Sequence, residues 1–383
     1  MSQKNVYLDY AASTPMDPKV LKAMEPYFSK QFFNPSAVYS KAKDVRSVVE
    51  DSRRSVALNL GAKSSEIIFT AGGTEANNLA LTGVMNAHPN GNMVISAIEH
   101  PSVYAPAKNF NARICPVDKE GLIKINKLKD LIDDDTNLVS IIYVSNEIGV
   151  IEPLKEVASI IQTIRSDRLS RGITRPIYFH TDACQAANYL DLHISKLGVD
   201  LMTLNGSKIY GPKQSGTLFV KSSVRLKPII FGGGQERGLR SGTENVPGII
   251  GFAAALDLAQ DSKKSESDRL AHLQEYFITS LTNNFQNAKI NGSRIKRVVN
   301  NVHVTFPNVD NERLLISLDE KGIMAAAGSA CSASNELPSS VLKAIGLTNL
   351  EARNSIRFSF GRYLIKSDLE YTLDTLKTLL KLS

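Results

Sequence analysis

The stretch Glu66-Ile67-Ile68-Phe69-Thr70-Ala71-Gly72-Gly73-Thr74-Glu75 decides the fold class of this chain. A short run of β-branched and aromatic residues stops at two glycines, which permit a tight turn, and a helix is expected to start at Thr74. The free backbone N–H groups and the dipole at such a helix start suit a phosphate. A simple N-cap followed by an acidic first turn explains the same residues equally well.

Further short apolar runs alternate with helical patterns on both sides of this stretch. They lie at residues 93–96, 139–144, 177–180 and 218–220. Near-continuous apolar strands between helices are typical of a mostly parallel sheet that is covered on both faces. The pattern therefore predicts an α/β fold.

The last third of the chain has a different pattern. A helical stretch over 248–258 leads into the polar segment 260–266, where we predict a domain hinge. Strands are expected at 302–306 and 355–359 and a helix at 312–319, which together predict a smaller α+β domain. The expected division is a large domain of residues 16–259, and a small domain formed by residues 1–15 and 260–383.

Composition narrows the class of protein. With 383 residues, 43% of them hydrophobic and 22% charged, the chain can bury a large core and is expected to be a globular protein. Its widely spaced cysteines indicate a reducing compartment in which free thiols survive, by default the cytoplasm. No apolar run approaches the ~20 residues of a membrane span, so no membrane contact is expected. The three cysteines are widely spaced, which predicts neither a disulfide framework nor a metal site. Basic runs at 165–171 and 294–297 lack interleaved aromatics and are expected to be solvated loops rather than nucleic-acid sites.

Three later residues have chemistry that fits a cofactor enzyme. Asp182 follows a predicted buried strand, at the sheet edge where α/β proteins keep their sites, and could hold a pyridinium nitrogen protonated. Lys208 lies in a turn and could bind a carbonyl covalently if its ammonium loses a proton readily. Cys331, in the small-residue stretch Gly328 to Cys331, becomes a strong nucleophile once ionised. Each also has an ordinary explanation: a turn residue, a solvated charge and a small buried hydrophobe.

The phosphate turn, the aspartate and the lysine follow one another as three anchors of pyridoxal phosphate. At this point the sequence resembles the cysteine desulfurases, which are pyridoxal-phosphate enzymes of the aminotransferase class V group, over nearly the whole chain. The matching motifs are Tyr7 to Pro15, Asn34-Pro35-Ser36, Gly73-Thr74-Glu75, Glu99-His100-Pro101, Asn146 to Gly149, Asp182 with Gln185, Lys208 to Pro212, Gly232 to Thr243, Gly328 to Cys331 and Ser355-Ile356-Arg357. The resemblance implies a fold-type I enzyme whose large domain has a mostly parallel seven-stranded sheet, and whose small α+β domain carries Cys331.

The resemblance also implies a set of cofactor-binding residues. They are Gly73, Thr74, His100, Asp182, Gln185, Asn205, Ser207, Lys208 and Thr243. Lys208 would hold the cofactor covalently and carry protons, and His100 would stack on its ring and help with acid–base steps. Asp182 would pair with the ring nitrogen and Gln185 with the phenolic oxygen. Thr243 would reach the phosphate from the second subunit of a homodimer.

The implied reaction converts L-cysteine to L-alanine. Asn146 and Arg357 would hold the substrate carboxylate, for which a guanidinium fork is well shaped. Cys331 would attack the sulfur, carry it as a persulfide and pass it to acceptors, such as an iron–sulfur scaffold or tRNA-thiolation enzymes. The long segment after Cys331 resembles the branch of the family that serves general iron–sulfur assembly.

Three positions depart from the family pattern. Asn205 and Ser207 stand where the family usually has serine and histidine, and Tyr39 stands where it often has histidine. Because these changes spare Lys208 and Cys331, they put cofactor affinity and rate in question rather than reaction type. A selenocysteine lyase or another class V enzyme remains an alternative, as does a sulfur scaffold with weakened cofactor binding. The basic stretch 165–175 is either a partner contact or a tolerated surface loop.

Overall fold

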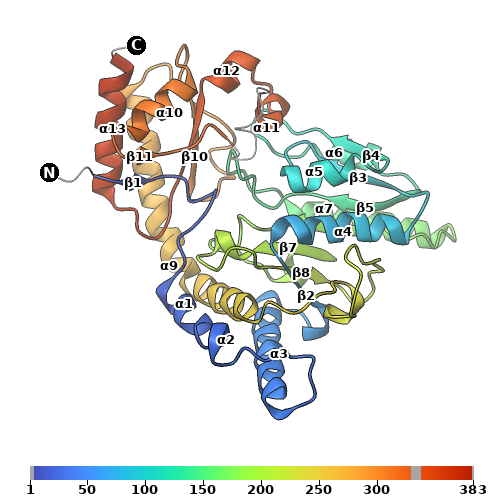
Figure 1. Ribbon diagram of the computed structural model, residues 1–383. Coiled ribbons are helices and arrows are strands. Elements are labelled where there is room, and N and C mark those ends of the chain that lie inside the picture. The colour runs from blue at the N-terminus through green and yellow to red at the C-terminus, as the bar shows by residue number, and fades with distance from the viewer. Residues whose placement is uncertain (1–3, 329–337, 382–383) are drawn as a thin grey trace.

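The computed structural model describes residues 4–328 and 338–381, and its central layer is a seven-stranded sheet (Figure 1). The strand order is β2-β8-β7-β6-β5-β3-β4. In this order, each pair of neighbouring strands from β7 through β6, β5 and β3 to β4 is parallel, whereas β8 runs antiparallel to both β7 and β2. The bounds are β2 (Ile67–Thr70), β3 (Asn92–Ser96), β4 (Ala112–Cys115), β5 (Thr136–Ser140), β6 (Tyr178–Asp182), β7 (Leu201–Asn205) and β8 (Gly216–Val220). The predicted mostly parallel α/β sheet is confirmed.

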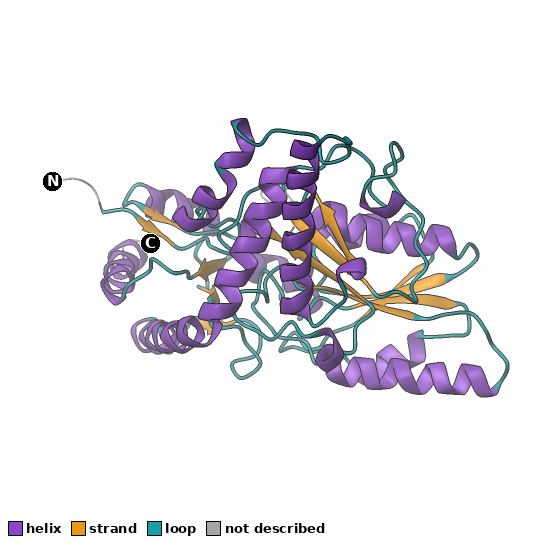
Figure 2. Cartoon of the chain, turned by 90° about the horizontal axis from the view of Figure 1, so that it is seen from below, coloured by secondary structure: helices purple, strands orange, loops and turns teal. Residues whose placement is uncertain are grey.

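Helices cover both faces of this sheet, as Figure 2 shows. One face packs against α4 (Gly73–Ala87) and α5 (Pro101–Ala107). The other face packs against α3 (Ser40–Leu60), α7 (Leu154–Ser170) and the first part of α9 (Val246–Asn284). Every strand of this sheet except the edge strand β4 is buried along nearly its whole length, so the residues of these strands are mostly apolar without alternation, which is the pattern seen in the sequence.

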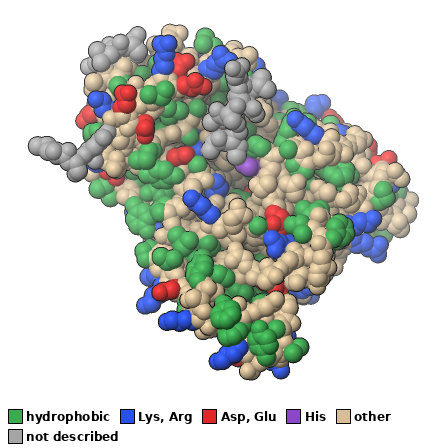
Figure 3. All heavy atoms as spheres, in the orientation of Figure 1, with side chains coloured by type: hydrophobic (Ala, Val, Ile, Leu, Met, Phe, Trp, Pro, Cys, Tyr) green, Lys and Arg blue, Asp and Glu red, His purple; other side chains and the backbone are tan. Residues whose placement is uncertain are grey.

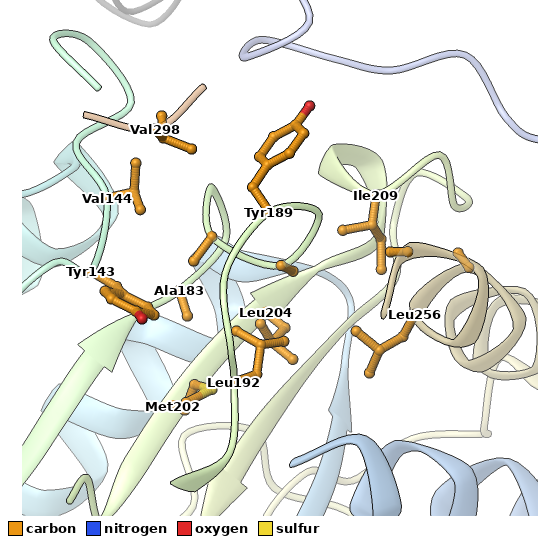
Figure 4. Packing of buried hydrophobic residues seen from close by; sticks show 14 of the residues in the cluster. Tyr143, Val144, Ala183, Tyr189, Leu192, Met202, Leu204, Ile209, Leu256 and Val298 are labelled. Carbon is orange, nitrogen blue, oxygen red and sulfur yellow. The ribbon is translucent and has the colours of Figure 1, made fainter. Parts of the chain in front are cut away.

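The alternation of side chains along a strand divides the core into two clusters. Ile68 of β2 joins the cluster of α4, whereas its neighbour Ile67 joins the cluster of α3 and α9. In Figure 4 Met202 and Leu204 of β7 lie in this second cluster with Leu256 of α9. Packing on both faces fixes the strand register, because a shift by one residue would exchange the two faces.

A smaller unit contains the first and the last of the described residues. Its antiparallel sheet has the order β12-β10-β9, and a second sheet pairs β1 with β11 in parallel. The bounds are β1 (Val6–Tyr7), β9 (Lys289–Ile290), β10 (Asn301–Thr305), β11 (Ile323–Met324), β12 (Ser355–Ser359), α10 (Asn311–Asp319), α11 (Ser340–Ala344), α12 (Asn349–Arg353) and α13 (Lys366–Lys381). The strands predicted near 302 and 355 and the helix predicted near 312 are therefore present.

The segment 260–266, where we predict a domain hinge, lies inside the 39-residue helix α9 and is not a loop. Its polar residues form the less buried turns of a helix that remains attached to the loop after β6. Gln260 donates to the carbonyl of Ala187 (2.6 Å), and the Ser267 hydroxyl donates to the carbonyl of Tyr189 (3.3 Å). The division of the chain into two domains at this point stays a prediction.

The expectation of a solvated loop at 165–171 is also wrong. All but the last of these residues belong to α7, and Arg168 is buried, with its guanidinium donating to the carbonyls of Asp133 and Thr136. Arg165 forms an ion pair with Asp200. These charges hold the helix end to the sheet. In the second basic run Arg297 is buried as well.

Short elements complete the described part of the chain. They are α1 (Pro18–Met24), α2 (Pro26–Ser29), α6 (Ile125–Leu131), α8 (Ile194–Leu197), and the 3-10 turns η1 (Ser64–Glu66), η2 (Gly206–Lys208) and η3 (Glu236–Gly238). Among the helices of residues 4–328 and 338–381, none combines the length and the apolar character needed to cross a bilayer.

Candidate active site

A pocket opens at the carboxyl ends of β6 and β7, beside the first turns of α4 and α5. Its walls are formed by Ala11, Ala12, Gly73, Thr74, His100, Ser102, Ile142, Asn146, Asp182, Cys184, Gln185, Asn205, Lys208 and Arg357. An adjoining hollow shares Gly73, Thr74 and Asn205 and adds Ser207. Most of the site residues named from the sequence therefore meet in one place, although they are far apart along the chain.

The glycine turn at the start of α4 shapes one end of the pocket. Gly72 has a φ of 132°, which a side chain would disfavour, and α4 begins at Gly73, one residue before the predicted start. A Cβ on Gly73 would lie 2.9 Å from Sγ of Cys184, so the backbone approaches the site closely. The N–H groups of a first helical turn have no partner within the helix. This end of the pocket is suited to an anion.

Asn205 and Ser207 lie together on the opposite side of this turn. The Asn205 side-chain oxygen accepts from the N–H and the hydroxyl of Ser207, each at 3.1 Å. The amide nitrogen of Asn205 therefore points its N–H groups away from Ser207. Both residues are uncharged, so this part of the site offers hydrogen-bond donors without the charge of an imidazole.

Asp182, the last residue of β6, is buried and held by two N–H donors. Its Oδ1 accepts from the backbone N–H of Cys184 (3.0 Å), and its Oδ2 accepts from the side-chain amide of Asn77 (2.7 Å). Behind it, His180 hydrogen-bonds to Ser140 (2.8 Å), and burial lowers its pKa to about 4. His180 is therefore a neutral core residue, whereas the Asp182 carboxylate lines the pocket.

Lys208 reaches into the pocket from η2. Its Nζ donates to the carbonyls of Ala11 (2.9 Å) and Ala12 (2.5 Å), and Gln185 also donates to Ala11 (2.9 Å). Burial lowers the pKa of Lys208, because the charged ammonium loses its hydration. An amine that loses its proton more readily is a better nucleophile and a better proton carrier. The N-terminal segment 9–12 thus lies directly against the lysine.

His100 is the N-cap of α5. Its Nδ1 accepts from the backbone N–H of Ser102 (3.1 Å) and lies 2.7 Å from the hydroxyl of the same residue. Burial lowers the pKa of His100, so the neutral imidazole is favoured. Since Nδ1 is an acceptor, the ring hydrogen is on Nε2.

Arg357 is a buried cation at the far end of the pocket. Its guanidinium donates to the backbone carbonyl of Asn146 (2.8 Å) and to the carboxylate of Asp9 (2.6 Å). Its Nε is buried without an acceptor in the described part of the chain. An unsatisfied donor on a buried cation suits a carboxylate ligand. Asp9 was not singled out in the sequence, because its contact with Arg357 joins opposite ends of the chain.

One of the described residues predicted for the site, Thr243, is not brought to this pocket. Thr243 lines a separate hollow with Thr70 and Arg240. Cys331 lies outside the described residues. The residues that flank its segment are described: the hydroxyl of Ser339 donates to the buried carboxyl of Glu147 (2.5 Å), and a Cβ on Gly328 would lie 3.3 Å from the same oxygen. Glu147 follows the pocket residue Asn146 directly.

Comparison with known proteins places the whole chain in one group. Residues 6–372 match the Aminotransferase class-V family. The cysteine desulfurase IscS of Dictyoglomus turgidum is 40% identical over 99% of this chain and 95% of its own length. A NifS-like protein from Rickettsia africae has a similar structure, with a TM-score of 0.88 and 31% identity over 99% of this chain and all of that chain. The structure of SspA in complex with cysteine gives a TM-score of 0.80 and 32% identity over 94% of this chain and all of that chain.

Proposed function

The chain belongs to the aminotransferase class-V family and, within it, to the cysteine desulfurases, and we propose on this basis that it takes sulfur from L-cysteine and releases L-alanine. One observation carries the proposal beyond family membership. The pocket combines a partly buried lysine, Lys208, with a carboxylate held by two N–H donors, Asp182, and a buried guanidinium with a free N–H, Arg357. These are the groups needed for a carbonyl cofactor and an amino-acid substrate.

The pocket fits pyridoxal phosphate, the cofactor of the class-V family. The hollow at the first turn of α4, lined by Gly73, Thr74, Asn205 and Ser207, leaves room for a phosphate, with the last three residues as further donors. Asp182 would face the ring nitrogen, and Lys208 would bind the carbonyl carbon. When bound, this cofactor supplies an electron sink for the substrate. The loss of a histidine at position 207 would reduce the positive charge around the phosphate.

The remaining residues would bind and orient the substrate. Arg357 and the Asn146 side chain would hold its carboxylate, and the free Nε–H of Arg357 supports that role. Gln185 would hydrogen-bond the phenolic oxygen of the cofactor. Lys208, whose pKa is lowered by burial, would accept a proton and return it at the substrate carbon. His100 would stack on the ring and present its Nε2–H to the site.

Sulfur transfer would use Cys331. Its thiolate attacks the sulfur of the substrate, so that an S–S bond forms as the C–S bond breaks. The electron pair left on the substrate carbon takes up a proton and gives alanine, and the sulfur stays on Cys331 as a persulfide. Acceptor proteins such as an iron–sulfur scaffold and tRNA-thiolation enzymes would then receive it. A thiol with this role requires a reducing compartment, so we place the enzyme in the cytoplasm.

A homodimer is the proposed assembly. Large apolar side chains are exposed near α2 and before η3, namely Phe28, Phe32, Val38, Tyr39 and Phe231. Figure 3 shows hydrophobic side chains gathered over the α1–α2 region. Exposed apolar patches of this kind mark protein interfaces. Because Thr243 lies apart from the pocket of its own chain, it is available to a second subunit.

The deciding experiment measures alanine formation from L-cysteine by the cofactor-loaded protein, together with the mass of the Cys331 peptide. We expect alanine and a persulfide on that peptide, with both lost in Lys208→Ala and Cys331→Ala. Cys115→Ala is the matched control, since Cys115 is buried in the core away from the pocket. Undiminished alanine release by Cys331→Ala, or activity on selenocysteine alone, would contradict the persulfide mechanism. A protein that takes up no pyridoxal phosphate would contradict the enzyme proposal and favour a sulfur scaffold.

A further inference from the structure

We propose that Asn77 and Ser102 are positioning residues that hold the Asp182 carboxylate and the His100 imidazole in one fixed hydrogen-bonded array. This inference rests on the proposed function, because it assigns the array to the cofactor ring that those two groups would contact. Neither Asn77 nor Ser102 belongs to the set of site residues inferred from the sequence.

Asn77 is the centre of the array. It lies on α4, is fully buried, and donates from Nδ2 to Oδ2 of Asp182 (2.7 Å) and to the hydroxyl oxygen of Ser102 (2.8 Å). An amide nitrogen carries two hydrogens, and both are used here. The amide cannot turn over, because its oxygen would then face the carboxylate.

The oxygen of the same amide shows what this orientation costs. Oδ1 of Asn77 is buried and has no hydrogen-bond partner in the described part of the chain. Leaving a buried acceptor unsatisfied is unfavourable, so it persists only where the other contacts outweigh it. Here those contacts are the two N–H donations to Asp182 and Ser102.

Ser102 connects Asn77 to His100 by hydrogen bonds. Its hydroxyl oxygen already accepts from Asn77, so its one hydrogen is free for Nδ1 of His100, 2.7 Å away. The Ser102 backbone N–H donates to the same nitrogen (3.1 Å). Nδ1 therefore accepts two hydrogen bonds, and the imidazole exchanges protons with the pocket only through Nε2. In this way the carboxylate of β6 sets the tautomer of a histidine at the start of α5.

The array also immobilises the carboxylate. One oxygen of Asp182 is held by the backbone of Cys184 and the other by Asn77. The charged groups that face His100 are the Asp182 carboxylate and the Lys208 ammonium, and their effects on its titration are opposite. A change at Asn77 should therefore reach both groups that would touch the cofactor ring, although Asn77 itself does not line the pocket.

The first test titrates His100 in the cofactor-free protein, by NMR of histidine labelled with ¹³C at Cε1, with His100→Gln to assign the signal. In Asn77→Ala the Ser102 hydroxyl oxygen loses the hydrogen bond from Asn77, so it can accept from Nδ1 of a protonated His100. In Ser102→Ala the hydroxyl that donates to Nδ1 of the neutral imidazole is removed. Both variants should raise the pKa of His100 by roughly 0.5–1 unit, the titration equivalent of one hydrogen bond. Asn78→Ala is the matched control, because Asn78 lies beside Asn77 on α4 but its side chain, within the described residues, donates to the Thr74 carbonyl (2.9 Å) instead, and the change should leave the pKa of His100 unchanged.

The second test measures pyridoxal-phosphate affinity with Asn77→Asp. A carboxylate at this position would face Asp182 at hydrogen-bond distance, and two such groups share one proton, which deprives the ring nitrogen of its partner. We expect affinity to fall by about tenfold or more.

The two tests separate this inference from the proposed function. If the wild type takes up no pyridoxal phosphate, the proposed function fails. The titration of His100 in the cofactor-free protein still shows whether Asn77 and Ser102 form the hydrogen-bonded array. If the wild type binds the cofactor but His100 titrates alike in the wild type, Asn77→Ala and Ser102→Ala, the array is refuted. An equal shift in Asn78→Ala also refutes it. Should Asn77→Ala fail to fold, Ser102→Ala carries the same prediction.

Discussion

Glu236→Gln tests how far a buried ion pair fixes the segment that leads to Thr243. Glu236 and Arg53 form two hydrogen bonds of 2.7 Å, and their side chains are only 3% and 5% exposed. The Glu236 carboxylate also accepts from the N–H of Phe69 (2.8 Å) at the end of β2. One pair therefore joins α3, β2 and η3.

The expected cost follows from the burial of Arg53. Glutamine keeps the size of Glu236 but removes its charge, and so leaves a guanidinium uncompensated inside the protein. Removing one partner of a buried pair costs about 3–5 kcal/mol. Glu50 also contacts the Arg53 Nε (3.1 Å) and is half exposed, so a part of the charge stays neutralised. We expect a loss near the lower limit, about 3 kcal/mol.

Urea unfolding followed by tyrosine fluorescence measures this loss, since the chain has 12 tyrosines and no tryptophan. Asp134→Asn is the matched control, because it breaks an exposed arginine pair with Arg171 and should leave the unfolding midpoint unchanged. Combining Arg53→Met with Glu236→Gln should recover stability relative to Glu236→Gln alone, since no charge is then left unpaired. A Glu236→Gln midpoint equal to that of Asp134→Asn would refute the reasoning.

Three further predictions concern the pocket and its surroundings. Arg357→Lys should raise the KM for cysteine by about tenfold or more, because a lysine cannot replace the guanidinium fork; steady-state kinetics with an unchanged KM would exclude a carboxylate role for Arg357. Gly73→Ala should weaken pyridoxal-phosphate binding in a titration, because the new Cβ would lie 2.9 Å from Sγ of Cys184, and adding Cys184→Ala should restore part of the affinity. Burial raises the pKa of Glu152 to about 8 in the folded protein, compared with 4.5 in the unfolded chain. The protonated Glu152 side chain therefore contributes fully to stability below pH 4.5, and this contribution is lost as the pH rises through about 8. Glu152→Gln should therefore flatten the decline of the urea midpoint over that range, and a decline as steep as that of the wild type would contradict this assignment.

The sequence predicts those parts of the site that depend on local pattern. Asp182 and Lys208 follow apolar strands, and Gly73 lies in a strand–turn–helix signal, so the sheet edge brings them together. Asn77, by contrast, is 105 positions from Asp182, and only the packed fold shows that its amide contacts the carboxylate. The same limit explains the incorrect prediction at 165–171, where basic residues bond to carbonyls of a distant segment. Composition alone does not reveal that 260–266 is helical, because a polar helical turn and a polar linker contain the same residues.

The N-terminal segment against Lys208 has a consequence for biosynthesis. Ala11 donates its N–H to the Ser359 hydroxyl of β12 (2.9 Å), and Asp9 pairs with Arg357 of the same strand. Residues 9–11 therefore cannot complete this wall of the pocket until β12, 348 positions further along the chain, has been synthesised. Contacts between such distant positions form slowly, because a long loop must close first. Chains that lack β12, whether nascent or truncated, should thus be unable to hold the cofactor, which ties catalytic competence to the synthesis of this strand.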